Sequence, residues 1–142
     1  MTSCGPRTSA SDQMQLHAED VDVQHRRLGQ LVNELAGALA AEQRRCFVIR
    51  RTLSALINFS EIHFSDQEEF MKLYSYPPEL LELHIGAHLE FLAKLRAVHD
   101  NSDGDLMALG PALIAWIRDW IEDHALTEDR AYLVHFRQAL HS

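Results

Sequence analysis

The sequence predicts an all-α fold, an antiparallel up-down four-helix bundle in one domain. Its 142 residues are enough for a single domain with a real core. Four segments repeat apolar residues at three- and four-residue steps, and none shows the two-residue alternation of a strand. Because short connections join the four segments, consecutive helices are expected to run antiparallel.

The chain is expected to divide into a flexible N-terminal arm, residues 1–16, and the bundle, residues 17–142. The arm is rich in Ser, Thr, Gly and Pro and has almost no apolar residues. The first helix is expected to end near Ala41, and the second to span about 44–73. The Tyr-Pro-Pro sequence at 76–78 ends the second helix, because proline lacks an amide donor and restricts the residue before it.

The third helix is expected over roughly residues 80–98. The Asn-Ser-Asp-Gly sequence at 101–104 predicts a turn after it. Gly-Pro at 110–111 is expected to divide the last region into a short turn from Asp105 and a main helix. Proline suits the first position of that helix, which then runs to about Leu140.

Charge and composition exclude several classes of protein. The net charge is −8, whereas nucleic acids and anionic membranes bind basic faces. No apolar run reaches the ~18 residues that cross a bilayer, so we expect no membrane partner and a cytoplasmic location. Cys4 and Cys46 form neither a disulfide framework nor a metal-binding spacing.

Histidine is unusually frequent, with nine residues. His84 and His88 lie four apart, so a helix presents both on one face, where they can bind one metal ion. Alone, such a pair is weak evidence of a metal site, because it is more often a pair of surface or hydrogen-bonded histidines. His124 and Asp129 lie five apart, about 140° around a straight helix. They therefore contact different edges of a site, or a local distortion of the helix brings them together.

His25 and His63 lie on the apolar stripes of the first and second helices. A lone histidine at such a position is usually a hydrogen-bonded core residue. Here, however, every helix contributes an inward histidine, and each buried ring left unpaired would cost about 1–3 kcal/mol. Inward ligands from all helices of a bundle indicate a metal site, and imidazole with carboxylate suits iron, with zinc, manganese or copper as chemical alternatives. The other histidines are expected at the surface or termini: His17, His99, His135 and His141.

Four blocks of sequence resemble the bacterial hemerythrins. They are Val-Asp-Val-Gln-His-Arg-Arg-Leu at 21–28, the stretch from His-Phe to Tyr-Pro at 63–77, His-x-x-x-His-x-x-Phe at 84–91, and Trp-Ile-Glu-Asp-His with an aspartate five residues on at 120–129. The resemblance covers about residues 20–136, and the order of the blocks makes it specific.

The resemblance implies a hemerythrin-like bundle with two iron ions joined by an oxo or hydroxo group (Fe-O-Fe or Fe-OH-Fe). It implies that one iron has three histidine ligands and the other two, with an open position on the second for dioxygen or another small diatomic or peroxide ligand. Asp129 would bridge the irons. The implied ligands are His84, His88 and His124 for the first iron and His25 and His63 for the second.

The sequence departs from the family where a second bridging carboxylate is expected. The family has glutamate four residues after the second-helix histidine, whereas this chain has Gln67, followed by Glu68. Gln67 as a neutral, weak ligand is the first interpretation. A π-type bulge that delivers Glu68 is the second, and a weakly held or missing second iron is the third. Trp120 either walls the iron pocket or packs in the core.

The leading functional prediction is a dioxygen carrier, store or sensor. The alternative is an enzyme that reduces peroxide, nitric oxide or dioxygen at the position left open by Gln67. A third hypothesis is a metal-storage or interaction module. The sequence makes no prediction of oligomeric state.

Overall fold

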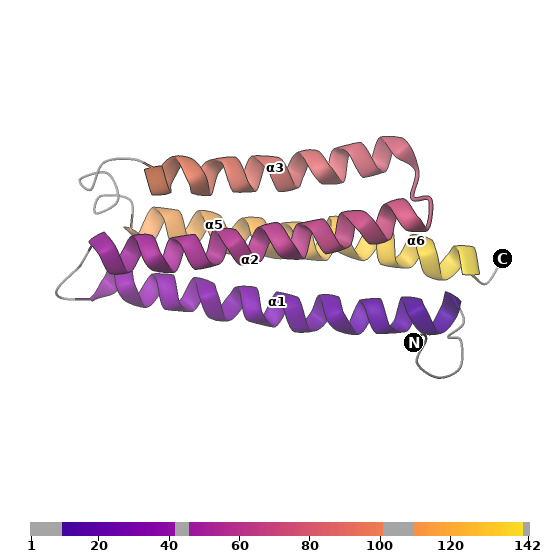
Figure 1. Ribbon diagram of the computed structural model, residues 1–142, viewed down its shortest axis with the longest axis horizontal. Coiled ribbons are helices and arrows are strands. Elements are labelled where there is room, and N and C mark those ends of the chain that lie inside the picture. The colour runs from indigo at the N-terminus through magenta and orange to yellow at the C-terminus, as the bar shows by residue number, and fades with distance from the viewer. Residues whose placement is uncertain (1–9, 42–45, 101–109, 141–142) are drawn as a thin grey trace, which may run out of the picture.

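The computed structural model describes residues 10–41, 46–100 and 110–140, and it contains no strand within these ranges (Figure 1). Four long helical segments run antiparallel, which confirms the predicted bundle. The fourth consists of two α-helices joined by one π-helical turn. The elements are α1 Ala10–Ala40, α2 Cys46–Leu73, α3 Pro78–Asp100, α5 Gly110–His124, η1 Ala125–Asp129 and α6 Arg130–Leu140.

The helix ends lie close to the predicted positions, with one exception. Helix α1 begins at Ala10, so its first turns fall within the segment expected to form an arm. Residues 1–9 of that segment, and the short turn expected from Asp105, lie outside the described residues. Helix α5 begins at Gly110, with proline next to it as expected.

The turn between α2 and α3 follows from its sequence. Ser75 adopts a left-handed conformation with φ of 58°, a conformation that commonly ends helices. The backbone N–H of Tyr76 donates to the carbonyl of Met71 at 2.9 Å and so satisfies one of the last carbonyls of α2. Pro78 then opens α3, since the first turn of a helix needs no amide donor.

The apolar core lies in two parts with a polar layer between them. Helix α1 packs against α2 and against both halves of the fourth helix, and α2 packs against α3. The larger cluster includes Leu35, Leu53 and Ile117, and the smaller consists of Met71, Tyr76, Tyr132 and Phe136. The inward histidines of the four helical segments gather where the two clusters meet, so the packing places them at one level of the bundle.

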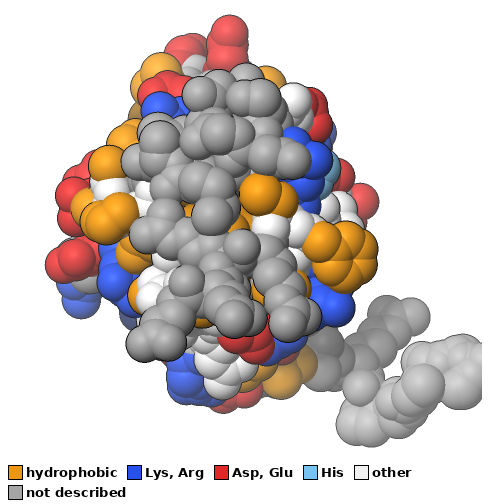
Figure 2. Space-filling model, turned by 90° about the vertical axis from the view of Figure 1, so that its left-hand side faces the viewer, with side chains coloured by type: hydrophobic (Ala, Val, Ile, Leu, Met, Phe, Trp, Pro, Cys, Tyr) orange, Lys and Arg blue, Asp and Glu red, His pale blue; other side chains and the backbone are white. Residues whose placement is uncertain are grey.

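The surface mixes charges of both signs. Figure 2 views the bundle from the end at the left of Figure 1 and shows acidic, basic and hydrophobic side chains interspersed around its rim. Among the described helices, none has a stretch long and apolar enough to cross a bilayer.

Candidate metal centre

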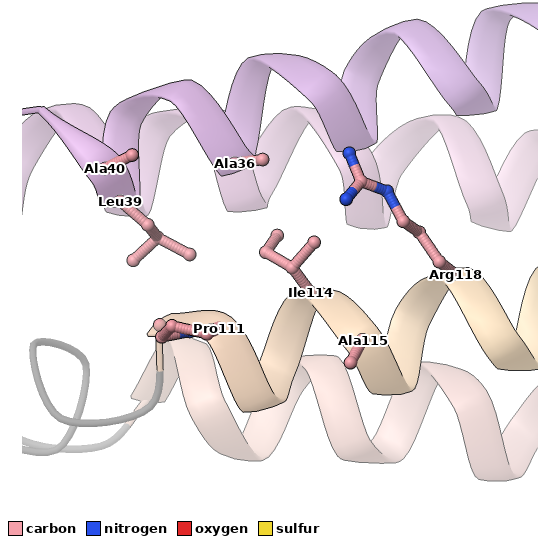
Figure 3. Close-up of a pocket in the computed structure, with 8 residues that line it drawn as sticks. Ala36, Leu39, Ala40, Pro111, Ile114, Ala115 and Arg118 are labelled. Carbon is pink, nitrogen blue, oxygen red and sulfur yellow. The ribbon is translucent and has the colours of Figure 1, made fainter.

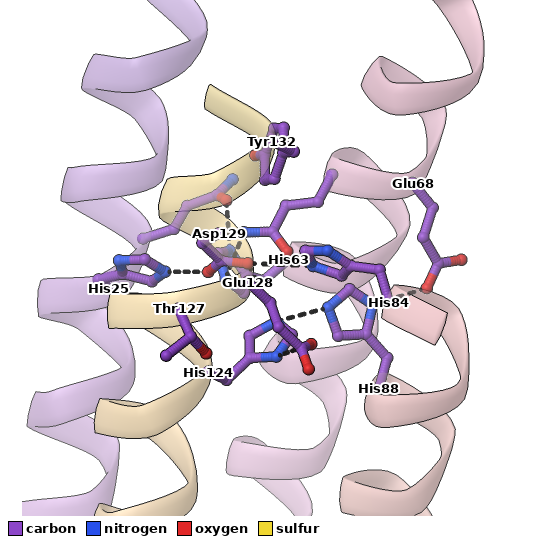
Figure 4. A network of polar contacts seen from close by, with 12 residues as sticks. His25, His63, Glu68, His84, His88, His124, Thr127, Glu128, Asp129 and Tyr132 are labelled. Carbon is purple, nitrogen blue, oxygen red and sulfur yellow. Dashed lines mark hydrogen bonds and ion pairs between the residues drawn. The ribbon is translucent and has the colours of Figure 1, made fainter. Parts of the chain in front are cut away.

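Five histidines and one aspartate meet in the polar layer between the two apolar clusters (Figure 4). They form two groups, each with ligand atoms within 4.8 Å of one another, and Asp129 belongs to both groups. Every helical segment of the bundle contributes at least one of these side chains. One group is His84, His88, His124 and Asp129, and the other is His25, His63 and Asp129.

The carboxylate of Asp129 lies between the two groups. Its Oδ2 accepts a hydrogen bond from His25 Nε2 at 2.8 Å. Its Oδ1 lies 3.1 Å from His84 Nε2 and 3.0 Å from His124 Nε2. The two oxygens therefore face different groups, which is the arrangement that a bridging carboxylate requires.

A π-helical turn brings His124 and Asp129 to the same side of the fourth helix. In a straight α-helix, residues five apart differ by about 140°, so one of the two would face away from the site. The turn Ala125–Asp129 is π-helical, with the i to i+5 hydrogen bonding that places such residues above one another. Thr127 Oγ1 donates to the carbonyl of Asp123 at 2.7 Å within this turn. The structure thus contains the local distortion that was one of the two alternatives.

Three of the five histidines have polar groups beside their outer ring nitrogens. His88 Nδ1 donates to Glu68 Oε2 at 2.8 Å, and His124 Nδ1 lies 2.8 Å from Glu128 Oε2. His63 Nδ1 donates to the amide oxygen of Gln24 at 2.5 Å. A proton held at Nδ1 leaves the lone pair of the imidazole on Nε2, so Glu68 and Gln24 select for His88 and His63 the ring form that binds metal through the inner nitrogen. The contact between His124 and Glu128 lacks hydrogen-bond geometry.

The inner atoms fit a metal ion better than they fit one another. His88 Nε2 lies 3.0 Å from His124 Nε2, and that nitrogen is also 3.0 Å from Asp129 Oδ1. A single proton on His124 Nε2 cannot satisfy both a lone pair and a carboxylate oxygen. A cation among them satisfies all three, so the donor set fits a metal such as iron.

Gln67 and Glu68 take different places around the site. Gln67 is fully buried, and its Nε2 lies 3.3 Å from His63 Nε2. Its Oε1 is buried without a hydrogen-bond partner, which leaves a carbonyl oxygen free to turn toward a metal ion. Glu68 contacts the outer nitrogen of His88 because α2 is a continuous α-helix from Cys46 to Leu73. The π bulge considered for Glu68 therefore does not occur in α2, and this carboxylate does not lie in the bridging position.

Burial keeps the inner imidazoles neutral. Desolvation lowers the pKa of His63 to about 3 and that of His88 to about 2, since a buried imidazolium loses its hydration. Burial alone would raise the pKa of Asp129. Hydrogen bonds from His124, His25 and His84 outweigh burial and hold that pKa well below the ordinary value. At neutral pH His63 and His88 are therefore neutral and Asp129 is ionised, the protonation states that metal binding needs.

Aromatic side chains enclose the three-histidine group. Trp120 stacks on His124 with ring centroids 4.5 Å apart and on Phe91 at 4.2 Å, so it both walls the site and packs in the core. Phe64 stacks on His88 at 3.9 Å. These rings keep water from the imidazoles and restrict their rotation.

Some residues that contact the site were not singled out from the sequence. Gln24 directly precedes His25, and Glu128 lies four residues after His124, a spacing that indicated a shared face.

His17 was expected at the surface, but it is only partly exposed. Its ring stacks on Phe70 and lies 2.7 Å from the hydroxyl of the fully buried Tyr132. Burial lowers the pKa of His17 and raises that of Tyr132.

Comparison with known proteins finds matches to hemerythrins. Residues 16–135 match the model of the family described as Hemerythrin HHE cation binding domain. A bacteriohemerythrin of Ralstonia nicotianae is 34% identical over 118 residues, which cover 81% of this chain and 80% of that protein. A bacteriohemerythrin of Stenotrophomonas maltophilia is 25% identical over 126 residues, covering 85% and 76%.

A myohemerythrin matches a shorter part of the chain. The myohemerythrin of Sipunculus nudus is 36% identical over 83 residues, covering 56% of this chain and 59% of that protein. No solved structure matches the chain. The family match and the Ralstonia relative each extend over most of the bundle that carries the histidines. The chain therefore belongs to the hemerythrin family.

Proposed function

We propose that this chain holds two iron ions and binds dioxygen, as a carrier, store or sensor. His84, His88 and His124 hold one ion, and His25 and His63 hold the other. The observation that carries the proposal is the position of Asp129 between the two groups, with Oδ2 at 2.8 Å from His25 and Oδ1 at 3.1 Å from His84. Membership in a cation-binding family and the preference of iron for imidazole and carboxylate support it.

The two ion positions differ in what the chain supplies. Three imidazoles and a carboxylate oxygen surround one position, whereas the other has two imidazoles and one carboxylate oxygen. The second position therefore keeps more room for an exchangeable ligand. Iron at these positions would supply the reversible binding of dioxygen, with electrons from both ions. Gln24 holds the ring of His63 in its ligating form, and the aromatic rings beside His88 and His124 exclude water.

A second candidate function is the reduction of peroxide, nitric oxide or dioxygen. Gln67 favours it, because a neutral amide stands one turn after His63 with an unpartnered, buried oxygen. A neutral ligand binds metal less firmly than a carboxylate and leaves the position easier to displace. Faster exchange at that position favours turnover over long-lived binding.

One experiment separates the two functions. The protein is loaded with ferrous iron under anaerobic conditions, its iron content is measured, and its optical spectrum is followed after exposure to air. A long-lived oxygenated spectrum that reverses on removal of dioxygen supports the carrier, store or sensor. Rapid conversion to a ferric product with continued consumption of dioxygen or peroxide supports the enzyme. Failure to bind iron contradicts both.

A further inference from the structure

The metal centre reaches the surface beside His25. The side chain of His25 is 23% exposed, whereas His84 is 3% and His124 is 5% exposed. A cavity of about 400 Å³ lies at this place between α1 and the fourth helix, and both His25 and Asp129 line it. The apolar cavity between the ends of α1 and α5, lined by Leu39, Ile114 and neighbouring side chains, contains no residue of the centre (Figure 3). The approach beside His25 leads to the group with fewer protein ligands.

Two arginines line the same cavity. Arg130 and Arg137 are seven residues apart on α6, two helical turns, so both lie on one side of that helix. Both are exposed, and among the described side chains neither has a hydrogen bond or ion pair. Asp22 lines the cavity from α1 and offsets one of the two positive charges. The ionised carboxylate of Asp129 at the base offsets the other charge until a metal ion binds beside it.

This charge distribution is unnecessary for dioxygen, which is neutral, but it suits an anion. A guanidinium group presents paired N–H donors that match two oxygens of a planar oxyanion. Once a metal ion neutralises Asp129, the two arginines and Asp22 leave the lining with a net positive charge, which raises the local concentration of anions and their rate of entry. Metal ions behind His25 would add to the same field.

We propose that this cavity is a binding vestibule for a small inorganic monoanion, such as nitrite, which Arg130 and Arg137 direct to the exchangeable position beside His25. The inference goes beyond the proposed function and rests on it, because the anion would occupy the same exchangeable position as dioxygen. The arginines would speed the entry of small anions and leave the entry of neutral molecules such as dioxygen unchanged.

The test compares an anionic and a neutral probe. Azide association with the ferric, iron-loaded protein is measured by stopped-flow absorbance at low and high ionic strength. Nitric oxide association with the ferrous protein provides the neutral reference. The variants are Arg137→Gln, Arg130→Gln, the double variant, and Arg137→Lys, which keeps the charge. Arg51→Gln is the matched control, because it removes an exposed arginine about 18 Å along α2 from His63.

The double variant is expected to lower the ratio of azide to nitric oxide association rates about threefold to tenfold at low ionic strength. It should also flatten the salt dependence of the azide rate, since salt screens the same charges. Arg137→Lys should retain most of the rate, and Arg51→Gln should leave it unchanged.

Three results would overturn the proposal that the cavity is an anion-binding vestibule. An unchanged ratio in the double variant shows that the arginines do not direct anions. An equal effect of Arg51→Gln shows that net charge alone is responsible. A parallel loss of both rates shows that the arginines affect access in general and do not act on anions. If wild-type protein loaded with iron shows no azide spectrum, the proposed function fails first, and the vestibule fails with it.

Discussion

Replacing Gln67 by glutamate returns a carboxylate to the position where relatives of this chain are expected to have one. Gln67 is fully buried and lies one turn after His63, with its amide nitrogen 3.3 Å from His63 Nε2. A unit charge about 4 Å from a metal ion contributes about 4 kcal/mol per unit of ion charge at an effective dielectric constant of 20. For a one-electron step this corresponds to a reduction potential lower by about 170 mV, since about 59 mV equals a tenfold change in the equilibrium constant.

The same substitution should destabilise the metal-free protein, whereas it should stabilise the iron-loaded protein. Without a cation, the new carboxylate is buried with incomplete pairing, which costs about 1–3 kcal/mol. We therefore expect Gln67→Glu to lower the melting temperature of the metal-free form and to raise that of the iron-loaded form. It should also bind the second ion more tightly and lengthen the lifetime of the oxygenated form.

The assay measures melting temperature, reduction potential and oxygenated lifetime for both proteins at one pH. Gln138→Glu is the matched control, because it adds the same charge at an exposed position on α6. If Gln67→Glu shifts both melting temperatures in one direction and leaves the potential unchanged, residue 67 does not face the metal ions. In that case the account of the open position is wrong.

Three further predictions concern the ligand histidines and their partners. His88→Ala should lose most of the iron and melt near the temperature of the metal-free protein, because bound metal stabilises only the folded state; full iron content would contradict the assignment. Glu68→Gln should weaken metal binding about 10–100-fold, because it removes the charged acceptor of His88 Nδ1. The control Glu69→Gln, at an exposed neighbouring position, should leave the affinity unchanged. Equal affinities of the two variants in a competition titration would refute the role of Glu68 in orienting His88. In the metal-free protein, burial lowers the pKa of His63 to about 3 and that of His88 to about 2, against about 6.5 in the unfolded chain. The unfolded state therefore binds more protons than the folded state below about pH 6.5. The free energy of unfolding should fall by about 1.4 kcal/mol per pH unit for each histidine as the pH drops toward the folded-state pKa values. A free energy of unfolding that is unchanged between pH 7 and 5 would contradict the buried, neutral state of these histidines.

The sequence predicted the bundle because its apolar residues repeat with helical period and its breaks coincide with proline and glycine. It also indicated the inward histidines, since His25 and His63 share stripes with core residues such as Leu28 and Leu56. These patterns depend on local spacing, which a single sequence displays directly. The start of α1 at Ala10 was not predicted, because the polar composition of that segment is equally typical of a loose arm.

Other features of the site depend on contacts between helices. The π turn at Ala125–Asp129 resolves the five-residue spacing, but spacing alone was compatible with a straight helix and two edges of a site. The place of Glu68 depends on which helix faces it, and the structure puts His88 of α3 there. Gln24 reaches the outer nitrogen of His63 across the α1–α2 interface, a distance of 39 residues in sequence. Such pairings follow from the relative rotation of the helices, which periodicity does not specify.

Iron stoichiometry tests the central claim most directly. The metal-free chain is loaded anaerobically with excess ferrous iron, unbound metal is removed, and iron and protein are quantified on the same sample. The two ligand groups that share Asp129 predict two iron ions per chain. A reproducible value near one, with the ring nitrogens of His25 and His63 unligated in the loaded protein, would contradict a two-iron centre.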